Sequence, residues 1–171
     1  MMAFVMPLTF SVWVTLLNNF VVDKANFGGA EIGILQSLRE IPGFLAFTAI
    51  FVLLIMKEQT FAVVSLSIMS IGVAITGWFP FEIGLYCTTV LMSIGFHYFE
   101  TVNQSLTLQW LDKKDSAHFM GKQLAVKGFA SIFAYAMIWV LMTLYGVSYS
   151  TVYMLAGGVG FFICMMIWLL F

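Results

Sequence analysis

The chain has 171 residues, of which 62% are hydrophobic and 9% are charged, with a formal net charge of −1. A soluble domain has about 25% charged residues, so this chain has too few to cover a surface that faces water. The composition predicts an integral membrane protein surrounded by a lipid bilayer, and the charge balance excludes a strongly basic binder of nucleic acid. Cys87 and Cys164 are isolated and form no zinc or redox motif.

Charged and turn-forming residues divide the chain into six apolar segments. Each is long enough for a helix that crosses a hydrocarbon core about 30 Å thick. The segments cover about residues 3–22, 31–56, 61–79, 83–109, 120–147 and 152–171. They are continuous apolar runs, too long for the strands of a membrane barrel. We therefore expect residues 1–171 to form one all-α domain, a polytopic membrane protein with six transmembrane helices.

Basic residues concentrate in two of the connections between these segments. Lys57 follows the second segment, and four lysines lie in or beside the connection after the fourth, namely Lys113, Lys114, Lys122 and Lys127. Short loops rich in Lys and Arg stay in the cytoplasm. We expect a multi-pass protein of a bacterial cytoplasmic membrane with both of its termini in the cytoplasm.

The fourth segment carries a polar stripe where a simple membrane anchor would be apolar. Ser93, His97, Glu100, Thr101 and Gln104 fall within an arc of roughly 100° on one helix face. A charge at the centre of a membrane helix costs about 2.5–3.5 kcal/mol on insertion scales. The stripe therefore predicts a partner or a function for these side chains.

The second segment places an arginine near the middle of the membrane. Arg39 lies roughly 13 Å from the outer end of its helix, on the same face as Gln36 and Glu40. An intramembrane arginine needs an anionic partner. Neighbouring residues point about 100° apart on an ideal helix, so Glu40 is expected to be a poor partner. His97 and Glu100 are expected roughly 8–12 Å deeper than Arg39.

Two interpretations of Glu100 remain open from the residues. Lys127 lies at a matching depth, roughly 9 Å past Gly121, and predicts a structural ion pair. Alternatively, Glu100 takes up and releases a proton as a cavity opens, with His97 as a relay. His97-x-x-Glu100 could also hold two metal ligands, but no further His or Cys lies at that depth, and we expect no metal and no cofactor.

Small and polar residues elsewhere fit helix packing. Gly29 and Gly33 have the spacing that lets two helices approach closely, and Gly157, Gly158 and Gly160 predict the same for the last segment. Asn18 lies on a polar face of the first segment that hydrogen bonds between helices would also explain. HExxH, GxSxG and paired aspartates are missing, so we expect no enzyme.

This pattern resembles the N-terminal half of a transporter of the major facilitator superfamily. The resemblance rests on six spans with both ends inside, the stretch GGAEIGILQSL, the short charged link at Lys57 and the basic link before Gly121. Gly95 matches a glycine of the family's fourth-span motif. Leu91 stands where the drug antiporters carry arginine, and the fifth span lacks their Gly-Pro motif, so the resemblance points to another branch of solute transporters.

The resemblance implies half of a twelve-helix fold, in which the first and fourth spans line a cavity and the third and sixth lie outside. It implies transport of a small solute by alternating access, coupled to a proton or cation, with a second six-span half or a second copy as partner. A chain that ends at a span looks like such a half or a fragment. The candidate pathway residues are Arg39, Glu100, His97, Gln36, Glu40, Asn18 and Gln104, with Lys127 as a structural partner. The alternative is a non-transporting membrane subunit or scaffold, whose polar residues only hold helices together.

Overall fold

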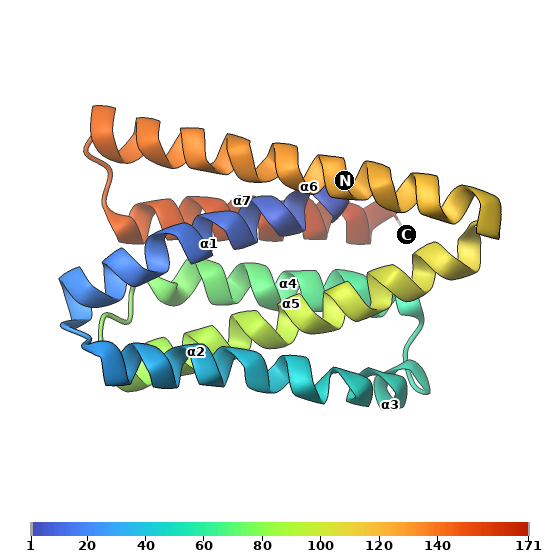
Figure 1. Cartoon of the computed structure of the whole chain (residues 1–171), viewed down its shortest axis with the longest axis horizontal. Helices are drawn as coiled ribbons and strands as arrows, with labels where there is room; N and C mark the ends of the chain where they lie inside the picture. The colour runs from blue at the N-terminus through green and yellow to red at the C-terminus, as the bar shows by residue number, and fades with distance from the viewer. Residues whose placement is uncertain (1, 171) are drawn as a thin grey trace.

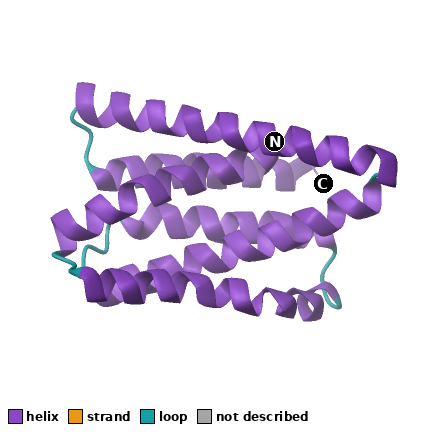
Figure 2. Ribbon diagram, viewed as in Figure 1, coloured by secondary structure: helices purple, strands orange, loops and turns teal. Residues whose placement is uncertain are grey.

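The structure is a computed structural model that describes residues 2–170, and it confirms the all-α prediction for them (Figure 1). Figure 2 shows helices joined by short turns, with no strand in the described part of the chain. The elements are α1 (Met2–Ala25), α2 (Gly29–Phe44), the 3₁₀ helix η1 (Leu45–Thr48), α3 (Ala49–Leu53), α4 (Glu58–Thr76), α5 (Glu82–Trp110), α6 (Lys113–Trp139), the π-helix η2 (Val140–Leu144) and α7 (Tyr149–Leu170).

Five helical segments are long and apolar enough to cross a membrane. They are α1, the interrupted rod from α2 to α3, α4, α6 continued by η2, and α7. With 29 residues, α5 is long enough but falls outside this group, because polar residues such as His97 and Glu100 lower its mean hydropathy. The polar stripe thus distinguishes α5 from the other five segments.

The observed helices follow the six expected segments in order, with two interruptions. The second segment changes from α to 3₁₀ geometry at Leu45, three residues after Pro42, which lacks the N–H that a helix needs and disturbs the turn around it. The fifth segment ends as a π-helix and begins at Lys113, earlier than expected, because a helix can extend beyond the apolar part of its sequence. Phe171, the expected last residue of the sixth segment, lies outside the described residues.

The helices form two layers (Figure 1). α6, α1, α5 and α2 run across the layer that faces the viewer, and α7 and α4 lie behind them. One end of the bundle holds residues 2 and 170 and the connections at residues 54–57 and 111–112, and we call it the termini end. The opposite end holds the connections at residues 26–28, 77–81 and 145–148.

The packing of the helices repeats between the two halves of the chain. α1 packs on α6 and α7, while α5 packs on α2 and α4. α4 and α7 pack on each other. Exchanging α1 with α5, α2–α3 with α6–η2 and α4 with α7 therefore reproduces these contacts. Because α1 is the first span and α5 the fourth, with two spans between them, these helices and the three-helix units that they begin run in opposite directions along the bundle (Figure 1).

α4 packs on both α5 and α7 of the second half of the chain, and glycines of these two helices let them lie close to α4. A Cβ atom at Gly95 would lie 2.7 Å from the Cα of Met69. Gly157 lies against the backbone of α4 in the same way, and Gly160 lies against Ser70. The third segment, α4, is therefore buried in the six-helix bundle. The expectation that it lies outside is wrong for this bundle.

Candidate functional site

A polar cavity of about 210 Å³ lies where α2 and α5 meet α1. Arg39 and Glu40 line it from α2, Ser93 and His97 from α5, and Phe10 from α1. The ring of Phe10 stacks on Phe96 of α5 with a centroid distance of 4.3 Å. Three of the predicted pathway residues, Arg39, Glu40 and His97, are therefore neighbours in one cavity, which we call the α2–α5 cavity.

Arg39 pairs with the residue next to it. Its Nε and one terminal nitrogen donate to Oε1 of Glu40 at 2.9 Å and 2.7 Å. The expectation that Glu40 is a poor partner is wrong, because both side chains are long enough to curl around the helix and meet although their Cβ atoms diverge. The side chain of Glu40 is 61% exposed and that of Arg39 is 26% exposed, so the pair lies at the open edge of the cavity.

A series of contacts aligns α2 with α5. The hydroxyl of Ser93 donates to the backbone carbonyl of Arg39. Four residues further along both helices, a Cβ atom at Gly43 would lie 2.7 Å from Cε1 of His97. The absence of a side chain at Gly43 thus makes room for the imidazole. His97 was expected to lie deeper in the membrane than Arg39, but both residues line the same cavity. In the observed register His97 is one helical turn beyond Arg39, and the long side chain of Arg39 spans that distance.

Glu100 belongs to a second cavity, of about 310 Å³, between α5 and α6. Nζ of Lys127 donates to Oε1 of Glu100 at 2.6 Å, which is the pairing expected from their depths. Both side chains are partly exposed, at 31% for Lys127 and 24% for Glu100. Gln104 lines the same cavity. The polar stripe of α5 is therefore divided: His97 faces α2, whereas Glu100 and Gln104 face α6.

The remaining candidates lie outside both cavities. Asn18 is exposed on α1, and Gln36 is partly exposed on α2. Neither lines the α2–α5 cavity or the cavity at Glu100. Two residues that do line the α2–α5 cavity, Phe10 and Phe96, were not among the predicted site residues, because nothing in the sequence distinguishes a cavity aromatic from a core aromatic. Ser93 had a sequence signal, since it belongs to the polar stripe.

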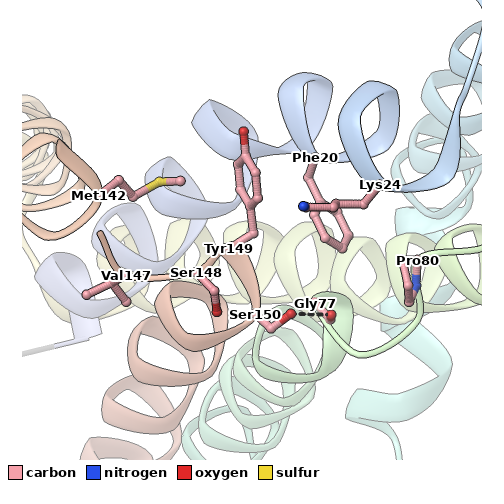
Figure 3. A pocket seen from close by; sticks show the side chains of 9 residues that line it. All are labelled: Phe20, Lys24, Gly77, Pro80, Met142, Val147, Ser148, Tyr149 and Ser150. Carbon is pink, nitrogen blue, oxygen red and sulfur yellow. Dashed lines mark hydrogen bonds between the residues drawn. The ribbon is translucent and has the colours of Figure 1, made fainter. Parts of the chain in front are cut away.

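A third cavity, of about 340 Å³, opens at the opposite end of the bundle (Figure 3). Phe20 and Lys24 of α1 and Tyr149 of α7 line it, together with Ser150, whose hydroxyl donates to the carbonyl of Gly77 at 2.6 Å (Figure 3). The hydroxyl of Tyr149 donates to Asp23 at 2.9 Å. These contacts tie α7 to α1 and α4, so this cavity is bounded by a structural junction.

The chemistry of the α2–α5 cavity is that of a polar binding site. It offers a guanidinium, a carboxylate, an imidazole and a hydroxyl beside aromatic walls. Such a set can bind a small polar solute by charge and hydrogen bonding. Within residues 2–170, no three His, Cys, Asp or Glu side chains are grouped as metal ligands. Comparison of the chain with protein families, with curated proteins and with solved structures found no match.

Proposed function

We propose that the chain is a six-span transmembrane half of a major facilitator type transporter, which moves a small solute by alternating access. The observation that carries the proposal is the exchange of helix contacts between the two three-helix units. In that transporter class each six-span half is built from two such units with inverted topology. The contact of α1 with α6 corresponds to that of α5 with α2, and the contact of α1 with α7 corresponds to that of α5 with α4. The contact between α4 and α7 corresponds to itself.

The α2–α5 cavity supplies the proposed solute site. It lies beside α1 and α5, the first and fourth spans, which line the central pathway in the proposed class. Arg39 lies about 15 Å along its helix from Gly29, which is close to the midplane of a hydrocarbon core about 30 Å thick. A polar group at that depth is expensive and is retained for function or for pairing. Arg39 and His97 are the proposed solute contacts, and a proton or cation is the proposed coupling ion.

The Arg39–Glu40 pair favours this proposal over a scaffold. Both residues belong to α2, so their ion pair does not join two helices. A residue whose role is to hold helices together would pair across an interface. The Glu100–Lys127 pair does join α5 to α6, and it is the observation that favours the alternative of a non-transporting membrane subunit.

The proposed partner is a second six-span half or a second copy of this chain. Alternating access needs two halves that rock around a shared site. On α2, Gly29 and Gly33 face open space, so the close approach expected at these glycines is absent within the unit. We assign this face to the partner half. The lysines in or beside the connections at the termini end support the proposal that this end faces the cytoplasm, in a bacterial cytoplasmic membrane.

A ligand-stability screen tests the proposal. The purified full-length protein is heated with sugars, amino acids, organic acids and nucleosides, and the unfolding midpoint is recorded. A solute at 100 times its dissociation constant stabilises the protein by about 2.7 kcal/mol. The stabilising solute is then assayed for uptake into proteoliposomes. We expect Arg39→Gln to abolish both the stabilisation and the uptake.

Lys122→Gln is the matched control, because it removes one positive charge from an exposed position of α6. It should leave stabilisation and uptake unchanged. A solute that stabilises the wild type and Arg39→Gln equally would show that the α2–α5 cavity is not its site. A solute that binds but is never taken up would replace the transporter proposal with that of a binding subunit. If no solute class stabilises the protein, the scaffold alternative gains support.

A further inference from the structure

The largest of the described cavities lies at the termini end, away from both polar sites of α5. It has a volume of about 530 Å³ and is formed where α4 begins and where α5 and α7 end. Lys57, Gln59 and Thr60 line it from the start of α4, Trp110 from the end of α5 and Trp168 from α7. We call it the Lys57 cavity.

The polar lining of the Lys57 cavity is rich in hydrogen-bond donors. Lys57 supplies an ammonium group, the two tryptophans supply indole N–H groups, and Gln59 and Thr60 add an amide and a hydroxyl. No carboxylate side chain is among its lining residues. The described part of the chain gives Lys57 no ion pair. An anion with several acceptor oxygens fits such a lining.

Glu58, the carboxylate next to Lys57 in the sequence, is not among the residues that line this cavity. Oε1 of Glu58 accepts hydrogen bonds from Ser105 at 3.0 Å and from Gln109 at 2.8 Å, both on α5. Glu58 therefore ties α4 to α5, and none of the described residues that line the cavity carries a negative charge. The start of α4 adds the positive end of its helix dipole at the same place.

An apolar cavity of about 380 Å³ adjoins the Lys57 cavity. Gln59 and Trp110 line both, so the two cavities share a wall. The second is lined mainly by apolar side chains, among them Ala62, Leu106 and Phe119. A donor-rich cavity beside an apolar one matches a ligand with an anionic head and a hydrocarbon chain.

We propose that the Lys57 cavity binds the phosphate headgroup of an anionic phospholipid, whose acyl chain lies in the adjoining apolar cavity. Tryptophan indoles favour the headgroup level of a bilayer, and anionic lipids of the cytoplasmic leaflet attract lysine. The proposal rests on the membrane embedding and on the orientation proposed above. It does not depend on transport or on the α2–α5 cavity.

Lipid retention by the full-length protein tests this site. The protein is purified in a neutral detergent with equal amounts of phosphatidylglycerol and phosphatidylcholine, and the bound lipids are counted by native mass spectrometry. We expect a preferentially retained phosphatidylglycerol, and Lys57→Gln should weaken its retention about five-fold, the factor given by about 1 kcal/mol per lysine. Lys114→Gln removes an equal charge from an exposed position of α6 and should leave retention unchanged.

A second test removes the indole N–H groups but keeps an aromatic ring at each position. Trp110→Phe combined with Trp168→Phe removes two donors and should also lower retention of phosphatidylglycerol. Trp78→Phe alters an exposed tryptophan at the opposite end and should have no effect. Equal retention of the two lipids by the wild type, or equal loss in Lys57→Gln and Lys114→Gln, would overturn the proposal.

Free anions distinguish the source of the phosphate. Inorganic phosphate and glycerol phosphate lack the acyl chain, so at millimolar concentration they should neither displace phosphatidylglycerol nor raise the unfolding midpoint. If either displaces the lipid, the site recognises soluble phosphate and the assignment to a lipid is wrong. A wild-type protein that retains phosphatidylglycerol but takes up none of the solutes tested would contradict the proposed function alone.

Discussion

Nζ of Lys127 lies 2.6 Å from Oε1 of Glu100, and this ion pair joins α6 to α5. The two helices share few other contacts, because α6 packs mainly on α1. The amide of Gln123 also donates to the hydroxyl of Thr107 at 3.4 Å, so two polar contacts join these sparsely packed helices. The ion pair serves equally as a structural clasp or as a contact that opens during transport. Stability and transport measurements on the same variants separate these roles.

Lys127→Met should destabilise the protein, because it leaves the carboxylate of Glu100 without its partner. Exposed ion pairs contribute about 0.2–1 kcal/mol, and breaking a buried pair costs about 3–5 kcal/mol. For this partly exposed pair we expect a loss of about 1–2 kcal/mol in unfolding free energy, measured by thermal or denaturant unfolding in detergent.

The double variant Glu100→Gln with Lys127→Met should recover most of that stability, because no unpaired charge remains. A double variant no more stable than Lys127→Met would contradict a direct pairing. If the double variant is stable but a solute found in the screen is no longer transported, the clasp explanation is insufficient and Glu100 has a role in transport.

Glu40→Gln should have a much smaller effect on stability than Lys127→Met. The Arg39–Glu40 pair lies within one helix, and the side chain of Glu40 is 61% exposed. We expect a change below about 1 kcal/mol in unfolding free energy, as for exposed ion pairs. A loss as large as that of Lys127→Met would show that Arg39 contributes to helix packing and would weaken its assignment to a solute site.

Gly95→Ala should destabilise the contact between α4 and α5. The added Cβ would lie 2.7 Å from the Cα of Met69, and backbone atoms cannot move aside as a flexible side chain can. We expect a cost of about 1–3 kcal/mol, which is typical of overpacking. Unfolding midpoints at a fixed detergent concentration provide the measurement.

Gly128→Ala is the matched control, because a Cβ atom there meets nothing within 4 Å. Within a helix, alanine is favoured over glycine by up to about 1 kcal/mol, so this variant should be neutral or more stable. Equal destabilisation by the two changes would indicate that α4 and α5 are not packed as closely as described.

The 3₁₀ helix η1 is anchored to α5 by one hydrogen bond. Oγ1 of Thr48 donates to the carbonyl of Leu45 at 2.7 Å, so the hydroxyl of Tyr98, 2.6 Å away, is the donor to Thr48. Tyr98→Phe should cost about 1 kcal/mol of unfolding free energy. Combined with Thr48→Val it should cost little more than Thr48→Val alone, because both changes remove the same bond. Additive losses in this cycle would contradict the contact.

Helix class and helix order could be predicted from the sequence, because uninterrupted apolar runs of this length leave few alternatives to membrane helices. The break in the second segment also had a local signal in Pro42. The pairing of Glu100 with Lys127 followed from counting residues along two helices, since the rise per residue converts sequence position into depth.

The partners of Arg39 and His97 could not be predicted in this way. Helical periodicity gives the direction of a side chain around its own axis, but it does not say which helix lies opposite or how far a long side chain bends. The ideal angle between neighbours therefore excluded Glu40, although the side chains of Arg39 and Glu40 meet. Likewise, the sequence predicted close packing at two groups of glycines. The prediction is right for Gly157 and Gly160. It is wrong for Gly29, Gly33 and Gly158, which face open space.

By itself, the sequence determined that the chain is helical, where its helices lie and which polar residues need partners, because these properties depend on local composition and period. Only the tertiary structure decided that His97 joins Arg39 at one cavity while Glu100 joins Lys127 at another. That division depends on the register and rotation of α5 between its two neighbours. The register and the rotation of α5 are fixed by its packing against both neighbouring helices, so the sequence of α5 alone does not determine them.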